Sequence, residues 1–187
     1  MLKKFLRLLP LIILASCASH VPVTGVCKST KTYNIKGKNY TPQKHYNYKA
    51  VGMASWYGPG FHGKKDACGL KYDQHQLTAA HKTLPLPCIG RVTNLENGKS
   101  TLVLFTDRGP FCDPNKRIID VSKGAAHKLD MVRNGVARVH VEVLPEHSAA
   151  FSNYIAKAQK HYGKKVKINW YRLFEHYFIR QSRKKFM

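Results

Sequence analysis

The sequence predicts an all-β fold, a small barrel, in the middle of a 187-residue chain. An Asn-Gly pair at 97–98 separates the strand-like runs 91–95 and 100–106, a pattern that is typical of a β-hairpin. Residues 137–144 alternate between apolar and polar side chains, as a half-buried strand does. Short strands joined by turns with Gly and Pro favour a barrel over a sandwich at this length. The inward-facing side chains of the alternating strand are Val139, Val141 and Val143.

The predicted barrel domain covers residues 51–145 and contains a further strand and a helix. Residues 117–121 have the composition of a short strand, and Ser122 directly follows them. A serine at this place caps a helix by accepting a hydrogen bond from a main-chain N–H group, which predicts a helix over 123–130. The apolar side of this helix consists of Ala125, Ala126 and Leu129.

Residues 1–16 have the features of a secretory signal peptide. A positively charged start precedes an apolar run at 8–14, which is too short to span a bilayer, since spanning takes about 20 residues. Residues 14–17, Leu-Ala-Ser-Cys, resemble the lipobox of bacterial lipoproteins. The resemblance implies that the signal peptide is removed and that Cys17 carries a lipid anchor in the membrane. Ala18 is not the Asp that retains some lipoproteins at the inner membrane, so a periplasm-facing place at the outer membrane of the cell envelope is favoured.

The two segments that flank the barrel domain differ in composition. Residues 17–50 show hardly any apolar periodicity, which predicts a flexible linker that cannot bury a core. Residues 146–187 form a basic tail, with helices expected over 149–162 and 166–180. The second helix places aromatic side chains on one face, which is consistent with an interfacial membrane helix or, as is commoner, with packing on a neighbouring domain. These side chains are Trp170, Phe174 and Tyr177.

The charge of the chain is strongly positive. Lys and Arg number 32 against 10 Asp and Glu, which gives a formal net charge of +22. A basic surface often marks a nucleic-acid-binding protein, but export from the cytoplasm argues against nucleic acid as a partner. The anions available to an exported protein are phospholipid head groups, other envelope polymers and the carboxylates of peptidoglycan stem peptides. A purely solubilising role of the lysines is equally consistent with the composition.

The cysteines predict disulfide bonds. Apart from Cys17 the chain has four, and an even number in an oxidising compartment predicts two bridges with three alternative connectivities. We expect at least two of Cys68, Cys88 and Cys112 to be bridged, with the remaining thiol reaching Cys27. None of the four lies in a CxxC pair, which argues against a zinc site, and no metal is predicted.

One carboxylate is in an unusual sequence context. Asp107 ends an apolar strand and is followed by Arg108-Gly109-Pro110, so it is expected to be rigid and partly desolvated. Asp73 and Asp120 are further candidates for chemistry. Asp66 follows two lysines in a predicted loop and is expected at the surface. The same holds for the acidic residues of the domain other than Asp73, Asp107 and Asp120.

Six motifs occur in order across residues 51–145: Gly52-Met-Ala-Ser-Trp-Tyr-Gly58, Phe61-His-Gly63, Leu77-Thr-Ala-Ala-His-Lys-Thr-Leu-Pro85, Val92-Thr-Asn-Leu95, Asp107-Arg-Gly-Pro-Phe111 and Arg117-Ile-Ile-Asp-Val-Ser122. Together they resemble the RlpA family of bacterial envelope lipoproteins. The resemblance implies a six-stranded double-psi β-barrel. It also implies a lytic transglycosylase that cleaves peptidoglycan glycan strands, preferring strands without stem peptides, often with division-site proteins as partners and with no cofactor.

The implied chemistry needs one acid. A lytic transglycosylase lets the 6-hydroxyl of N-acetylmuramic acid attack its own C1, which gives a 1,6-anhydro product, so no second carboxylate has to activate water. By resemblance Asp107 is this acid, and His81 orients or polarises it. Taken alone, His81 would be interpreted as a core histidine after a short helix. The residues expected to line the sugar groove are Trp56, Tyr57, His62 and Arg108.

The chain departs from the family at one position. The family has a functionally important Glu after the glycine that is Gly69 here, and this chain has Leu70 instead. Leucine can neither transfer protons nor stabilise an oxocarbenium charge, and losing one member of a catalytic set is commonly costly. The alternative function is therefore a non-catalytic envelope lipoprotein that binds peptidoglycan.

Overall fold

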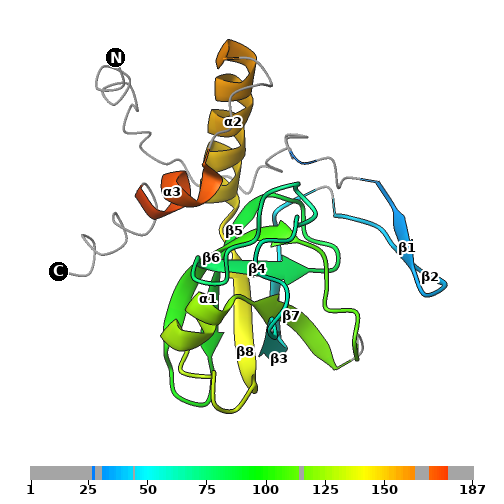
Figure 1. Cartoon of the computed structure of the whole chain (residues 1–187), viewed down its shortest axis with the longest axis vertical. Helices are drawn as coiled ribbons and strands as arrows, with labels where there is room; N and C mark the ends of the chain where they lie inside the picture. Colours follow the sequence, from blue (N-terminus) through cyan, green and yellow to red (C-terminus); the bar gives the residue numbers. More distant parts are fainter. Residues whose placement is uncertain (1–26, 28–30, 44, 114–115, 163–168, 177–187) are drawn as a thin grey trace.

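The computed structural model of the chain describes residue 27 and residues 31–43, 45–113, 116–162 and 169–176 (Figure 1). The predicted signal peptide, the predicted lipid anchor Cys17 and the aromatic residue Tyr177 lie outside the described residues. No helix among the described residues is long and apolar enough to cross a membrane.

Six strands close into a barrel in the order β3-β7-β4-β6-β5-β8. Two neighbouring pairs, β3 with β7 and β4 with β6, are parallel, and the other four pairs are antiparallel. This mixed closed barrel confirms the predicted all-β, double-psi fold. The strands are β3 (Lys49–Trp56), β4 (Thr78–His81), β5 (Cys88–Asn94), β6 (Ser100–Asp107), β7 (Arg117–Val121) and β8 (Val136–Val143).

The strands and the turn that sequence patterns predicted are present. β5 and β6 form the predicted hairpin, with Thr93 opposite Ser100 and Gly98 in the left-handed conformation that the turn requires (φ 73°). β7 has the predicted bounds. The inward side chains of β8 are buried in the barrel core, as the alternation predicted; they are Val139, Val141 and Val143.

The strand β4 corrects one expectation. A short helix was expected before His81, but residues Thr78–His81 form a strand that pairs with both β6 and β7. All four of its residues are buried. Because a strand buried on both faces shows no alternation of apolar and polar residues, periodicity could not identify it.

The helix α1 (Lys123–Lys128) confirms the predicted helix after β7, ending two residues earlier. The hydroxyl of Ser122 accepts a hydrogen bond from the Ala125 N–H, as a helix cap does. The helix packs closely on the segment that leads into β4, because a Cβ atom at Gly124 would lie 2.4 Å from the carbonyl oxygen of His75. Glycine is therefore the residue that permits this contact.

The segment predicted to be a flexible linker is partly structured, and the prediction is wrong for its described part. The strands β1 (Tyr33–Ile35) and β2 (Lys38–Tyr40) form a hairpin that projects to the side of the barrel in Figure 1. Tyr46 is 1% exposed and belongs to the barrel core. Aromatic side chains that are irregularly spaced can anchor a segment individually, and periodicity does not reveal them.

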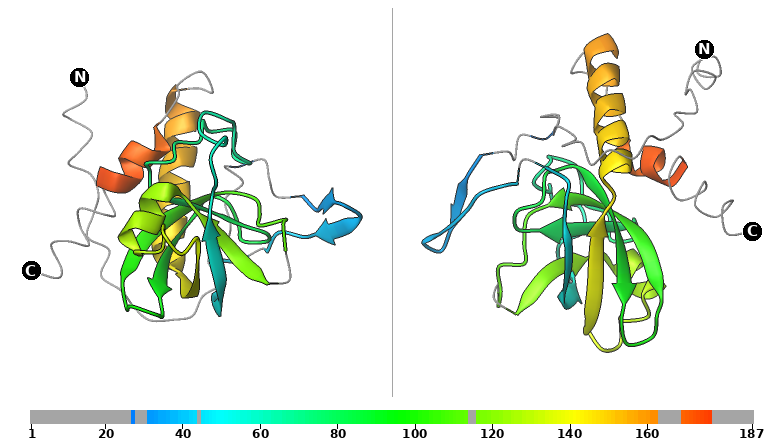
Figure 2. Two further views of the ribbon diagram at one scale, coloured as in Figure 1. Left: turned by 60° about the horizontal axis from the view of Figure 1, so that its bottom comes forward. Right: turned by 180° about the vertical axis from the view of Figure 1, so that it is seen from behind.

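Two helices follow the barrel, α2 (Pro145–Tyr162) and α3 (Trp170–Phe174), and Figure 2 shows α3 beside the base of α2. Their apolar side chains pack with the outward-facing Ile89 and Leu104 of the barrel in a second apolar cluster. Trp170 and Phe174 are buried there, which confirms packing rather than membrane contact for these two residues. The helical side chains of this cluster are Phe151, Ile155, Trp170 and Phe174.

The disulfide pattern differs from the expectation. Cys27 is bonded to Cys68, so the predicted contact of Cys27 with a domain thiol is present. Cys88 and Cys112 are free, and the expectation that two of the three domain cysteines are bridged is wrong. Cys88 is enclosed in the barrel core, where burial raises the pKa of its thiol, whereas Cys112 is exposed in the loop after β6.

Candidate active site

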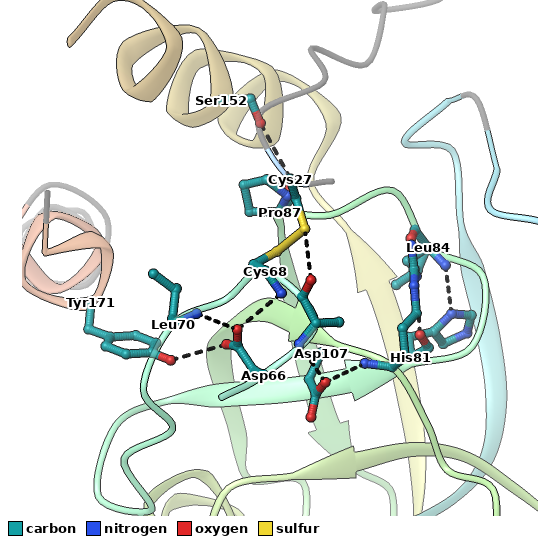
Figure 3. Close-up of a disulfide and its surroundings, with 12 residues drawn as sticks. Cys27, Asp66, Cys68, Leu70, His81, Leu84, Pro87, Asp107, Ser152 and Tyr171 are labelled. Atoms are coloured by element: carbon teal, nitrogen blue, oxygen red, sulfur yellow. Dashed lines mark hydrogen bonds between the residues drawn. A yellow bond between two sulfur atoms is a disulfide. The ribbon is translucent and has the colours of Figure 1, made fainter. Parts of the chain in front are cut away.

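Asp107 stands at the end of β6, where the chain leaves the barrel (Figure 3). Its Oδ1 accepts hydrogen bonds from the main-chain N–H groups of Ala67 (2.9 Å) and Arg108 (2.8 Å). The following Gly109 has a φ of 143°, which a residue with a Cβ rarely adopts. The predicted rigid placement of the carboxylate is therefore present, and two main-chain groups fix one of its oxygens.

The other oxygen of Asp107 faces an aromatic side chain from β3. Tyr57, directly after β3, donates its hydroxyl hydrogen to Oδ2 of Asp107 at 2.8 Å. Burial, and then the charge of Asp107, raise the pKa of Tyr57 well above its usual value, so the hydroxyl stays protonated and remains a donor. The ring of Tyr57 packs against those of Tyr72 (4.8 Å between centroids) and Phe61 (5.5 Å).

Arg108 turns away from the carboxylate. Its guanidinium donates to the carbonyl oxygens of His81 (3.3 Å) and Leu84 (2.6 Å) and lies over the ring of Tyr33 in β1. The side chain therefore braces the turn after β4 and the N-terminal hairpin. Arg108, a predicted groove residue, directly follows Asp107 in the chain. Its main-chain N–H, and not its guanidinium, contacts the Asp107 carboxylate.

His81 ends β4 beside β6, yet its ring faces the core. The ring packs edge-on against Tyr48 and Phe105, and its Nδ1 accepts the N–H groups of Thr83 (3.0 Å) and Leu84 (2.9 Å). Burial, together with neighbouring cations, lowers the pKa of His81 to about 3, so the imidazole is neutral with its proton on Nε2. His81 holds the turn on which Arg108 is anchored.

Asp66 is the functional candidate that the sequence patterns missed. It was expected at the surface, but it is 9% exposed, and Oδ1 accepts the N–H groups of Cys68 (3.0 Å) and Leu70 (2.8 Å). Burial raises the pKa of the Asp66 carboxyl to about 6, although hydrogen bonds from Thr106 and from the Leu70 N–H act in the opposite direction. A buried carboxyl with a raised pKa, one residue before the N–H donor of Asp107, is a candidate for a role in the site.

Leu70 lies on the same loop and faces the C-terminal helices. Its side chain packs against the cluster that contains Phe151 and Trp170. From α3, Tyr171 donates its hydroxyl hydrogen to Oδ2 of Asp66 at 3.4 Å, as Figure 3 shows. Leu70 thus makes an apolar contact between the loop and the C-terminal segment, at the position where the resemblance implies a Glu.

A polar cleft of about 460 Å³ lies between this loop and α3. His62 and Tyr72 line it from the barrel side, and Tyr171 and Arg172 line it from α3. The predicted groove residue His62 is exposed here, with Nδ1 3.7 Å from Oδ1 of Asp73. Tyr72 joins the cleft to the Asp107 site, because its ring packs against Tyr57.

Three further residues that the sequence singled out have separate places in the structure. Trp56, a predicted groove residue, ends β3 half-buried against the barrel core. The Asp120 carboxylate is occupied by structural contacts, because it accepts hydrogen bonds from Ser55 of the neighbouring β3 and from Arg117 of its own strand. Asp73 lines the cleft beside His62. Among the described residues no group of three or more His, Cys, Asp or Glu side chains could hold a metal ion.

Comparisons with known proteins place the barrel in a single family. Residues 49–141 match the family model described as lytic transglycolase. Relatives from several bacteria carry the name endolytic peptidoglycan transglycosylase RlpA. The one from Campylobacter jejuni is 48% identical over 141 residues, covering 75% of this chain and 50% of the relative. The one from Rickettsia felis is 48% identical (68% and 56% covered), and that from Neisseria meningitidis serogroup A is 50% identical (65% and 51%).

The chain therefore spans about half the length of the curated relatives it matches. One solved structure, Streptomyces papain inhibitor (SPI), is 23% identical, with a TM-score of 0.41 over 52% of this chain and 94% of that chain.

Proposed function

Because the chain belongs to the RlpA family, we propose that it is a lytic transglycosylase that cleaves peptidoglycan glycan strands, preferring strands without stem peptides. The observation that carries the proposal is the Asp107 carboxyl at the mouth of the barrel. One of its oxygens is fixed by two main-chain N–H groups, and the other has a single side-chain donor. Oδ2 is therefore the oxygen that is available for proton exchange with a substrate.

The proposed reaction uses Asp107 twice. Its protonated carboxyl gives a proton to the glycosidic oxygen as the bond between that oxygen and C1 of N-acetylmuramic acid breaks. The carboxylate then accepts the proton of the 6-hydroxyl as O6 bonds to C1, which returns the carboxyl to its starting form and leaves a 1,6-anhydro product. Tyr57, which stays protonated, holds the reacting oxygen in place, and Trp56 and His62 bind sugar residues on either side.

The positioning of Asp107 involves three residues outside its own strand. The Asp66 carboxyl holds the loop that presents the Ala67 N–H, and Arg108 ties the carboxylate to the turn that His81 organises. These contacts support a preorganised acid, which is how an enzyme avoids reorganisation during the reaction. His81 acts in this proposal as a neutral positioning residue.

The experiment is a digestion of purified glycan strands that lack stem peptides. The wild-type protein is expected to release products with 1,6-anhydro ends, and Asp107→Asn should lower the rate about 100-fold or more. Asp113→Asn makes the same chemical change in an exposed loop residue and should keep the wild-type rate. Full activity of Asp107→Asn would overturn the catalytic assignment.

Leu70 favours a second candidate function, a glycan-binding lipoprotein without catalysis. No carboxylate stands at this position to stabilise positive charge on the sugar, and the leucine contacts the apolar cluster instead. A wild-type protein that binds strands but yields no anhydro product would support this function. Trp56→Ala should then weaken binding, because a sugar face stacks on an aromatic ring.

The proposed location is the cell envelope. The lipobox supports lipidation of Cys17, and Ala18 supports an outer-membrane place that faces the periplasm. Division-site proteins are candidate partners, because the family resemblance includes action at the septum.

A further inference from the structure

We propose that the cleft between α3 and the loop after β3 is a subsite for a muramyl residue, and that Lys71 and Arg172 bind the free lactyl carboxylate of that residue. The inference rests on the proposed function and adds to it the chemical group of the strand that the protein recognises. The cleft includes residues of α3, which lies outside the part of the chain that the family model matches.

The two cations are available for a ligand. Both side chains line the cleft and are exposed, and neither makes an ion pair with any residue that the structure describes. Lys65 on the same loop is also exposed and pairs with Lys71 in an isolated β-bridge, so a further positive charge lies beside Lys71. A carboxylate that reaches it would gain charge-assisted hydrogen bonds, which are about twice as strong as neutral ones.

The rest of the lining suits a sugar that carries amide and hydroxyl groups. Gln76 and Asn169 contribute side-chain amides, and Tyr72 and Tyr171 contribute aromatic rings. The volume of about 460 Å³ is within the range of small-ligand sites. A mixed lining of this kind binds carbohydrate rather than an apolar ligand.

Two carboxylates also line the cleft, and they differ in whether they have partners among the described residues. Asp73 accepts the N–H of His75 at 3.0 Å and lies 3.7 Å from His62 Nδ1. Glu175, the capping residue directly after α3, is exposed and has no such partner among the described residues. Its charge should oppose a bound carboxylate, which provides a second variant with an effect of opposite sign.

The cleft is next to the proposed acid. The ring of Tyr72 lines the cleft and packs at 4.8 Å against Tyr57, whose hydroxyl binds Asp107. A glycan strand that extends from Asp107 across the rings of Tyr57 and Tyr72 therefore reaches Lys71 and Arg172. This continuity favours a neighbouring sugar of the same strand as the occupant.

The chemistry of the strand gives this subsite a selective role. In a strand without stem peptides the lactyl group of each muramyl residue ends in a carboxylate. Where a stem peptide is attached, the same carbon forms a neutral amide, which cannot make an ion pair. The subsite would therefore bind strands without stem peptides more tightly.

The test measures binding of two probes to the protein with Asp107→Asn, in which cleavage is blocked. One probe is a purified strand without stem peptides, and the other is the same strand with its lactyl carboxylates converted to primary amides. We expect about tenfold tighter binding of the carboxylate strand at low salt, equal to about 1.4 kcal/mol. Arg172→Gln should remove most of this preference, and Arg133→Gln, an exposed arginine outside the cleft, should keep it.

Glu175→Gln should strengthen binding of the carboxylate strand and leave binding of the amidated strand unchanged. Equal affinity of both probes for the parent protein, or a preference that survives Arg172→Gln and Lys71→Gln together, would overturn the subsite. Failure of the proposed function has a different signature, since a wild-type protein without cleavage products can still distinguish the probes.

Discussion

Asp66 illustrates how contacts from distant parts of the chain determine the chemistry of a single residue. Its sequence neighbours are two exposed lysines, which is why a surface position was expected. In the structure the carboxyl is covered by Tyr171, 105 residues away, and it binds two main-chain N–H groups of its own loop. Burial then raises its pKa to about 6. Local sequence contains no signal for such a contact.

The raised pKa predicts a specific dependence of stability on pH. Between the ordinary value near 3.8 and about 6 the folded state holds a proton on Asp66 that the unfolded state has lost. This contribution to stability is therefore complete at low pH and is lost as the pH rises to about 6, by roughly 2–3 kcal/mol. Asp66→Asn keeps an acceptor for both N–H groups but does not titrate. The free energy of unfolding of wild type minus that of Asp66→Asn should increase as the pH falls from 7 to 4.

His81 contributes in the opposite direction, which is why the variant comparison is needed. Its pKa is lowered to about 3 in the fold, so its contribution is present above about 6.5 and is lost as the pH falls toward 3. The wild-type profile alone would mix the two effects. Denaturant unfolding of both proteins across this range separates them, and a difference that does not change with pH would contradict the assignment for Asp66.

The site residues that the sequence predicted share one property. Asp107 and Tyr57 each adjoin a recognisable strand end within a contiguous motif, and the structure joins them by a hydrogen bond. For His81 the motif indicated a place near the acid, but the direction of its ring depends on Tyr48 and Phe105, which come from other strands. Side-chain direction of this kind follows from packing and not from local pattern.

At the scale of elements, the helix α3 explains the apolar residue on the active-site loop. Leu70 packs in the cluster that holds Trp170 and Phe174, so the loop and the helix share an apolar contact. A carboxylate at this position would have to enter that cluster or displace the helix. Leucine at position 70 is therefore consistent with the packing of α3 against this loop.

Leu70→Glu should loosen α3 from the barrel. Placing a charge in an apolar contact costs free energy, and we expect a destabilisation of roughly 1–3 kcal/mol. Fluorescence of Trp170 should shift toward the value of an exposed tryptophan, and Trp56→Phe in the background removes the other tryptophan signal. Leu95→Glu, in which the starting leucine is 47% exposed, should leave the spectrum unchanged.

The disulfide connects an N-terminal segment to the same loop. Cys27 and Cys68 are 41 residues apart, and a cross-link over a loop of this size restricts the unfolded chain. Cys27→Ser with Cys68→Ser should lower the free energy of unfolding by about 2–4 kcal/mol, measured by denaturant titration without reductant. Cys112→Ser, a change at an exposed free thiol, is the control, and equal stability of the two variants would refute a stabilising bridge.

Strands whose apolar residues recur regularly along the sequence were predictable, and strands without such a pattern were not. β8 alternates, and the β5–β6 hairpin has its Asn-Gly turn, so both followed from sequence. β4 is buried on both faces, and β1 and β2 have three residues each, too few to show a period. The capped helix α1 followed from Ser122, because capping is a local interaction.

At the scale of the molecule, segments outside the matched barrel converge on the candidate active site. The Tyr33 hydroxyl from the N-terminal hairpin donates to the carbonyl oxygen of Lys82, and its ring supports Arg108. Tyr171 of α3 contacts Asp66, and Cys27 is bonded to Cys68. Composition alone assigned these flanking segments to a linker and a tail, because their contacts are long-range and involve single aromatic or cysteine side chains.

The proposed lipid anchor makes a prediction about the fate of the whole chain in the cell. Cys17→Ala should leave the precursor unprocessed or free of the membrane, because the acylated side chain is lost. Fractionation followed by mass measurement of the N-terminus tests this, with Cys112→Ser as the control. Normal processing and normal membrane recovery of Cys17→Ala would contradict the anchor.

The bond between Cys27 and Cys68 also determines how far the barrel can stand from a membrane. From Cys17 to Cys27 there are about 10 residues, which fully extended span at most about 35 Å. Without the bond the first contact with the barrel would be that of Tyr33, whose hydroxyl donates to the carbonyl oxygen of Lys82, so the connection could reach roughly 55 Å at full extension. With the bond intact, the proposed anchor restricts Asp107 to glycan strands nearest the membrane, so reduction of a single disulfide would change the depth of cell wall within its range.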